Sequence, residues 1–129
     1  MFGFDEGRDN YQQVYENDSN DNKAEFSHEL LAGGASFMAM KMFEDRQRKE
    51  GKPVSHQFAK ELLAGFAGGE VDRLAETKGA DYIDREKAKR QAQKNAEDMY
   101  DQHYGDQDQY DPNQQEPPRH LREHFNPGW

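Results

Sequence analysis

The chain has 129 residues, of which 33% are hydrophobic and 33% are charged, and its net charge is -9. This length predicts one domain, and the low hydrophobic content indicates that part of the chain does not join a core. The absence of cysteine excludes disulfide bonds, thiolate metal sites and cysteine nucleophiles, and the acidic charge disfavours nucleic acid as a partner.

The first 23 residues are rich in Asp, Asn, Gln and Gly and carry an excess of acidic side chains. We predict an N-terminal arm over residues 1–23 that is mostly loop, with a short helical turn around Asn10 to Glu16. The opening MFGFDEGRDN lacks a basic stretch followed by an apolar one, so no secretory signal is expected.

A helical pattern begins near residue 24 and continues to about residue 50. Small and hydrophobic residues recur at spacings of three and four along two neighbouring lines, namely Leu30, Gly34, Phe37, Leu31, Ala35, Met38 and Met42. Gly51 is a suitable C-cap, and Pro53 prevents the helix from continuing.

Two further helices follow. Ser55 is a good N-cap for a helix over about 56–77, and Gly79 ends it. A third helix over about 81–104 has only a thin, alanine-rich apolar line, so it is expected to lie alongside the first two, with Gly105 after its end. The helical domain therefore covers residues 24–104.

The remaining segment, residues 105–129, is rich in Pro, Gln and Asp and has no usable period, so we expect a disordered or loosely docked tail. His120 and His124 have the i, i+4 spacing that suits a shared metal ion if the segment is helical. Prolines flank the pair, which favours adventitious binding, and we predict no metal site and no cofactor.

A repeat links the first two helices, because FSHELLAGGA at 26–35 returns as FAKELLAGFA at 58–67. Glycine inside a helix costs about 1 kcal/mol relative to alanine, and close approach of two backbones is the physical feature that offsets this cost. The repeat therefore predicts an antiparallel hairpin that crosses at its glycines. The predicted contact residues are Leu30, Leu31, Gly33, Gly34, Phe37, Leu62, Leu63, Gly65, Phe66 and Gly69.

Each copy of the repeat also carries one glutamate, Glu29 or Glu61, which raises the question of a paired acid–base or metal site. His28 precedes Glu29, but Lys60 precedes Glu61, and neighbouring residues on a helix do not face one another. The favoured interpretation is that each carboxylate interacts with the positive end of its helix. No catalytic residue is predicted, and the chain is not expected to be an enzyme.

The longest uncharged run in the apolar region, Leu30 to Met40, is far below the roughly 20 residues that a membrane-spanning helix needs. We expect a soluble protein of the cytoplasm or nucleus.

A cluster of large flexible side chains is interpreted as either ordinary core or a surface for a partner. It comprises Met38, Met40, Met42 and Phe43.

Residues 24–104 carry the motifs SHELLAG, GKPVSH, AKELLAGFAG, ETKG and DREKAK in this order, after the opening MFGFDEGRDNYQQVY. In these motifs the chain resembles the CipC-like antibiotic-response proteins, which are small, mostly fungal and induced by antibiotic or other stress. The resemblance implies a stress-associated intracellular protein without an assigned molecular activity. It supplies no catalytic residues.

Together these features predict an all-α fold, in which an antiparallel hairpin of two glycine-containing helices and a third helix lie between disordered polar tails. Small cores are often completed by self-association, so the first hypothesis is a non-enzymatic stress- or antibiotic-response protein that contacts a second copy or a protein partner. The alternative is a protein that binds an apolar small molecule, such as a lipid or an antibiotic, between helices. A metal protein that uses Glu29, Glu61 and nearby histidines is the least favoured hypothesis.

Overall fold

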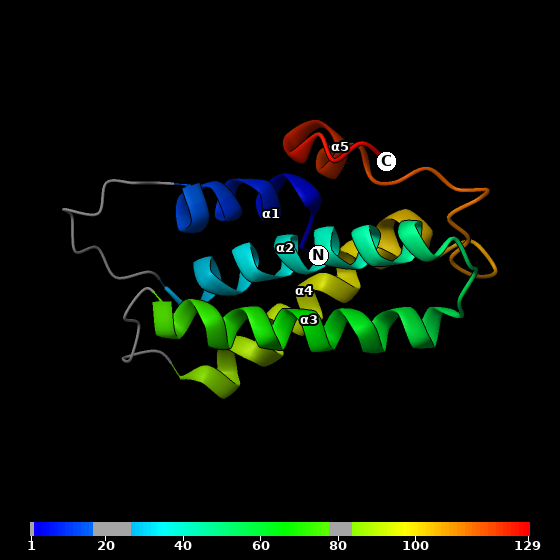
Figure 1. Ribbon diagram of the computed structural model, residues 1–129. Helices are drawn as coiled ribbons and strands as arrows, with labels where there is room; N and C mark the ends of the chain where they lie inside the picture. Colours follow the sequence, from blue (N-terminus) through cyan, green and yellow to red (C-terminus); the bar gives the residue numbers. More distant parts are fainter. Residues whose placement is uncertain (1, 17–26, 78–83) are drawn as a thin grey trace.

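The computed structural model describes residues 2–16, 27–77 and 84–129 (Figure 1). The helices in chain order are α1 (Phe4–Tyr11), the π-helical turn η1 (Gln12–Glu16), α2 (His28–Glu50), α3 (His56–Thr77), α4 (Arg85–Tyr104) and α5 (Arg119–Phe125). Over these three ranges the chain forms no strand, although one isolated β-bridge joins Val54 to Tyr110. The predicted all-α fold is confirmed.

The three long helices start and stop where local signals require it. The Ser27 hydroxyl accepts a hydrogen bond from the Leu30 N–H at 3.0 Å, and the Ser55 hydroxyl accepts one from Phe58 N–H at 3.1 Å. Each bond satisfies a backbone donor that has no partner within its helix. Gly51 ends α2 in the left-handed conformation at a φ of 71°, which glycine adopts without strain.

α2 is the central helix of the fold. It runs antiparallel to α3, α4 crosses behind both, and α1 lies on its remaining side (Figure 1). Helices on three sides explain why α2 is buried at every position from Leu31 to Phe37. The alanine line of α4 packs into the same core, with Ala88, Ala92 and Ala96 fully buried.

The two polar ends of the chain differ from the prediction wherever they are described. Residues 4–16 are helical rather than mostly loop, and Phe4, Tyr11 and Val14 are buried. The expected disorder of residues 105–129 is wrong: Tyr110 and Leu121 are fully buried, and α5 lies against α1 (Figure 1). A few large side chains anchor these segments, although they recur at no helical period.

The glycines of the first repeat copy serve a crossing of α1 over α2. A Cβ atom added to Gly33 would lie 2.7 Å from the Asn10 Cγ, and one added to Gly34 would lie 3.3 Å from the Asn10 carbonyl oxygen. Both separations are tighter than ordinary contact, so the two glycines allow α1 to approach α2 this closely.

Two glycines of α3, Gly65 and Gly69, do not line a helix crossing, whereas Gly68 is buried and a Cβ added there would lie 3.3 Å from the Gln93 Nε2 of α4. Gly65 and Gly69 are exposed, and no atom of the described chain lies within 4 Å of the Cβ that either would carry. The prediction that both copies form one glycine-lined contact between α2 and α3 is therefore wrong. Among the other predicted contact residues, Leu31, Phe37 and Leu63 are buried in the core, while Leu30, Leu62 and Phe66 are half-buried at its edge.

The methionine-rich cluster is divided by the fold. Met40 and Phe43 are fully buried, which contradicts their assignment to a partner surface, whereas Met38 and Met42 are half-buried. α2 has neighbours on three sides, so most of its large side chains point into the core.

None of the described helices combines the length and apolar character that a membrane-spanning segment requires.

Candidate functional site

A carboxylate lies at the centre of a polar cluster in the interior. The side chain of Glu44 on α2 is fully buried, and its two oxygens accept hydrogen bonds from the hydroxyls of Tyr104, at 2.5 Å, and Tyr110, at 2.9 Å. Arg48, one turn later on α2, donates from Nε to the same carboxylate at 2.8 Å. Three donors thus compensate a charge that would otherwise be costly to bury.

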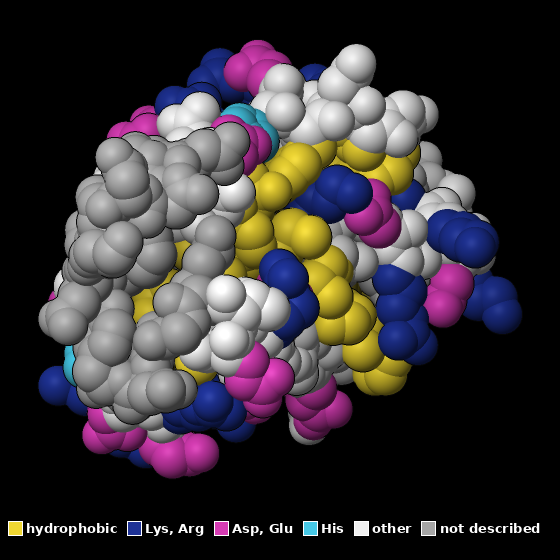
Figure 2. Space-filling model, turned by 60° about the vertical axis from the view of Figure 1, so that its left-hand side comes forward, with side chains coloured by type: hydrophobic (Ala, Val, Ile, Leu, Met, Phe, Trp, Pro, Cys, Tyr) yellow, Lys and Arg dark blue, Asp and Glu magenta, His cyan; other side chains and the backbone are white. Residues whose placement is uncertain are grey.

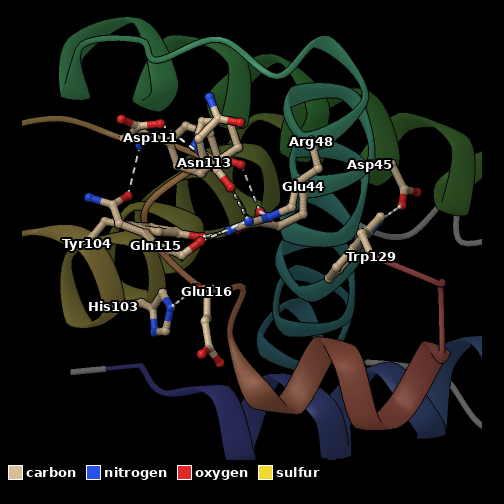
Figure 3. Close-up of polar contacts among 12 residues, drawn as sticks. Glu44, Asp45, Arg48, His103, Tyr104, Asp111, Asn113, Gln115, Glu116 and Trp129 are labelled. Atoms are coloured by element: carbon tan, nitrogen blue, oxygen red, sulfur yellow. Dashed lines mark hydrogen bonds and ion pairs between the residues drawn. The ribbon is translucent and has the colours of Figure 1, made fainter.

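Arg48 extends the cluster into the C-terminal segment (Figure 3). Its Nη1 donates to the carbonyl oxygens of Pro112, at 3.0 Å, and Gln115, at 2.9 Å, and its Nη2 donates to the Tyr104 hydroxyl at 3.0 Å. Burial alone would lower the pKa of Arg48, but the charge and hydrogen bond of Glu44 outweigh burial and raise it. The guanidinium therefore stays charged and ties the backbone after α4 to α2.

The tyrosines of this cluster act as donors. Burial raises the pKa of Tyr104 and Tyr110 well above the usual range, and the negative charge of Glu44 raises both further. Protonated hydroxyls are what the Glu44 carboxylate needs as partners. Because protein groups already bond the carboxylate and the guanidinium, the arrangement works as a clamp between α2, α4 and the segment after α4.

A smaller cluster of the same kind joins η1 to α3. The Tyr15 hydroxyl donates to Glu70 at 2.6 Å, and Arg73 donates to both oxygens of this carboxylate at 3.2 and 3.1 Å. The Arg73 guanidinium also lies over the Tyr15 ring. Burial raises the pKa of Tyr15, and its hydrogen bond to Glu70 adds to the effect.

The histidines are all used as links within the chain. His28 accepts from the Asp84 N–H at 3.0 Å, His56 bonds the Tyr100 hydroxyl at 2.6 Å, and His103 bonds the Glu116 carbonyl oxygen at 2.7 Å. His120 and His124 share the face of α5 that their spacing implies, but each meets a different carboxylate. These are Asp5, at 2.7 Å, and Glu16, at 2.9 Å. Across the ranges that the structure describes, no three His, Asp or Glu side chains converge as metal ligands would.

The two glutamates of the repeat do not meet. Glu29 lies in the first turn of α2 and Glu61 in the second turn of α3, and both are exposed. α2 and α3 are antiparallel, so these positions fall toward opposite ends of the pair (Figure 1). A depression beside Glu61 is open to solvent and is lined by His56, Lys60 and Glu97.

The outward side of α3 carries the most exposed large hydrophobic side chain among the described residues. Phe58 is 44% exposed and is the one large hydrophobic residue of the described chain in the exposed class. The residues that follow it at helical spacing, Leu62, Gly65, Phe66 and Gly69, are half-buried or exposed. We name these five residues the outer α3 face. Figure 2 shows hydrophobic side chains gathered in a band between charged ones on one face of the molecule.

Sequence patterns did not reveal the Glu44 cluster. A Glu–Arg pair at i, i+4 is typical of a solvated helix face, and only the position of α2 at the centre of the fold turns it inward. Tyr104 continues the spacing of four that Ala96 and Tyr100 follow, but Tyr110 lies in a polar stretch where no period marks it as buried. Four of the five residues of the outer α3 face belong to the predicted contact between α2 and α3. Leu62 and Phe66 pack against the core, and Gly65 and Gly69 are the two that the structure leaves without a described neighbour.

A family model described as virulence factor CipC-like matches residues 10–103. The match covers α2, α3 and nearly all of α4, together with the part of α1 that contacts Gly33. No curated protein and no solved structure matches the chain significantly.

Proposed function

The chain belongs to the virulence factor CipC-like family, and from this premise we propose that it acts without catalysing a reaction, through a contact between its outer α3 face and another protein. The resemblance to antibiotic-response proteins adds a setting, which is a response to antibiotic or other stress inside the cell. The physical basis of the proposal is the outer α3 face, and the setting is inferred from family alone.

The exposure of Phe58 is the observation that carries the proposal. Leaving apolar area in water forgoes about 25 cal/mol for each Å² that could be buried, and the other phenylalanines described are buried or half-buried. Aromatic side chains are enriched in protein interfaces, and an apolar helix face is a common surface for binding another protein.

The polar residues support a binding function over a reaction. The carboxylates of Glu44 and Glu70 accept hydrogen bonds from tyrosine and arginine side chains of the same chain, and each histidine has a partner within it. The outer α3 face, in contrast, consists of apolar side chains and glycines, which bind a partner through shape complementarity and the burial of apolar area.

The alternative function, binding of an apolar small molecule between helices, has less support. Leu31 on α2 and Leu63 on α3 are packed in the core and are each at most 1% exposed, while Phe37 packs against Tyr11 and Phe125 on the other side of α2. A ligand between the helices would have to displace packed side chains, which costs stability.

Site-specific photo-crosslinking in the producing cells tests the proposal. A photoreactive residue replaces Phe58 in one variant and Lys87, which is exposed on α4, in a control variant. We expect a defined adduct at position 58, identified by mass spectrometry, that is absent at position 87 and is lost when Leu62→Lys is added. Equal labelling at both positions would refute the proposed face.

Thermal unfolding in the presence of lipids and apolar antibiotics separates the two functions. A ligand that binds only the folded chain raises the melting temperature by mass action. We expect no saturable rise. A saturable rise that the Leu62→Lys change leaves intact would favour the small-molecule alternative instead.

A further inference from the structure

One line of exposed residues on α3 has oppositely charged ends and two glycines between them. Glu61, Gly65, Gly69 and Arg73 follow one another at intervals of four and are all exposed. We infer that a second copy of this chain packs against this line, with the two α3 helices antiparallel and crossing at Gly65 and Gly69. The inference rests on the proposed function, because it names the partner of the outer α3 face.

No described residue of the chain accounts for Gly65 and Gly69. Each costs about 1 kcal/mol in helix stability relative to alanine. At Gly33, the matching position of the first copy, the side chain of Asn10 fills the space where a Cβ would lie. At Gly65 and Gly69 the described part of the chain places no atom within 4 Å of that point. A second helix lying directly on these positions would use the missing side chains, as Asn10 does at Gly33.

Charge determines the direction of the second helix. The four residues are arranged symmetrically about Ala67, so an antiparallel copy brings Gly65 opposite Gly69 and Glu61 opposite Arg73, twice in each dimer. A parallel copy in register would bring Glu61 against Glu61 and Arg73 against Arg73. Opposite charges favour the first arrangement, and like charges disfavour the second.

The helix surface also suits such a crossing. Residues at intervals of four form a ridge inclined to the helix axis, and two such ridges align when the helices cross at about -50°. Arg73 is held at one end of the ridge by its bonds to Glu70, with its side chain 51% exposed, so it can meet a carboxylate with little loss of freedom. One helix pair is a small interface, so we expect a dissociation constant on the order of 10 µM or more.

Sedimentation equilibrium of the purified full chain tests whether a second copy binds. We expect a reversible monomer–dimer equilibrium that Gly65→Leu weakens at least tenfold, while circular dichroism shows an unchanged helix content. Gly65 has open space around it within the described chain, so the larger side chain has room in the monomer. Lys87→Glu on α4 serves as the control and should leave the equilibrium unchanged. A wild-type chain that stays monomeric up to millimolar concentration would overturn the inference.

Introduced cysteines test the direction, since the chain has none of its own. Disulfides form only where two Cα atoms come within about 7 Å. A mixture of Gly65→Cys and Gly69→Cys chains should give mainly the mixed disulfide upon mild oxidation. A predominance of the two homodimeric disulfides would overturn the antiparallel arrangement.

Charge reversal gives an independent measure. Glu61→Arg and Arg73→Glu should each weaken self-association, and an equal mixture of the two variants should restore it, because both pairs are then opposite in charge again. Failure of the mixture to dimerise would contradict the pairing. The cross-linking at position 58 keeps this inference separate from the proposed function. An adduct with a different protein, together with a purified chain that stays monomeric, would overturn self-association and leave the proposed protein contact standing.

Discussion

Gly33 and Gly65 occupy the same place in the two repeat copies but have opposite surroundings. Asn10 lies against Gly33, whereas the described chain leaves the space beside Gly65 open. One substitution made at both positions therefore separates the cost of crowding from the benefit of helix propensity.

We expect Gly33→Ala to lower the free energy of unfolding by about 1 kcal/mol, since overpacking costs about 1–3 kcal/mol and alanine returns about 1 kcal/mol of helix propensity. Gly65→Ala should raise the free energy of unfolding by up to about 1 kcal/mol. Urea denaturation in dilute solution, where the chain is monomeric, measures both. Equal effects at the two positions would contradict the crossing of α1 over α2.

The C-terminal segment is held to α2 by one side chain more than by any other, because Arg48 bonds two of its carbonyl oxygens and the Glu44 carboxylate. Removing one member of a buried ion pair leaves the other without compensation, which costs about 3–5 kcal/mol. The segment after α4 should then separate from α2 before the three long helices unfold.

We therefore expect Arg48→Met to lower stability by about 3 kcal/mol and to open residues 105–118 to protease. Trp129 is the one tryptophan of the chain and donates to Asp45 on α2 at 2.7 Å, so its fluorescence reports release of the segment. Arg46→Met is the matched control: Arg46 forms an exposed pair with Glu50 on the same helix, at 3.3 Å, and should cost less than about 1 kcal/mol. Unchanged protease resistance in Arg48→Met would disprove this anchoring.

The elements that could be predicted from the sequence are those whose helix caps and hydrophobic period lie within the element itself. Ser27, Ser55 and Gly51 cap helices whatever the tertiary fold, and the hydrophobic period of α2 and α3 is local. α1, η1 and the segment after α4 carry no such signals: they are held by single anchors such as Val14, Tyr110 and Leu121, whose burial depends on where α2 lies. The same dependence hid the Glu44 cluster, because its members are distributed over three elements.

At the scale of the whole molecule, buried tyrosines link stability to alkaline pH. Burial is the main cause that raises the pKa of Tyr15, Tyr100, Tyr104 and Tyr110 in the folded chain. In the unfolded chain the same groups lose their protons near pH 10. Above that pH the unfolded chain binds fewer protons than the folded one, so stability decreases as pH rises.

We expect the free energy of unfolding to vary little with these groups below about pH 9 and to decrease above pH 10, by up to about 1.4 kcal/mol per pH unit for each such tyrosine. Absorbance at 295 nm, which follows tyrosinate, should rise for these four residues only together with the loss of circular dichroism. Gradual ionisation of all six tyrosines in a chain that keeps its helices would contradict the burial of their hydroxyls.

The links between the two ends of the chain have a consequence for its synthesis. Asp5 bonds His120 across a separation of 115 residues, and the Phe2 carbonyl oxygen accepts from Gln102 across 100. A ribosome adds about 5–20 residues per second, so these two links can form only on the order of ten seconds after α1 has been made, although α1 can pack on α2 earlier. Glu44 likewise stays without Tyr110 until the segment after α4 has emerged. A nascent chain stalled near residue 104 would therefore lack the contact of α1 with α5 and one of the three donors to Glu44, and it would leave apolar surface exposed to chaperones.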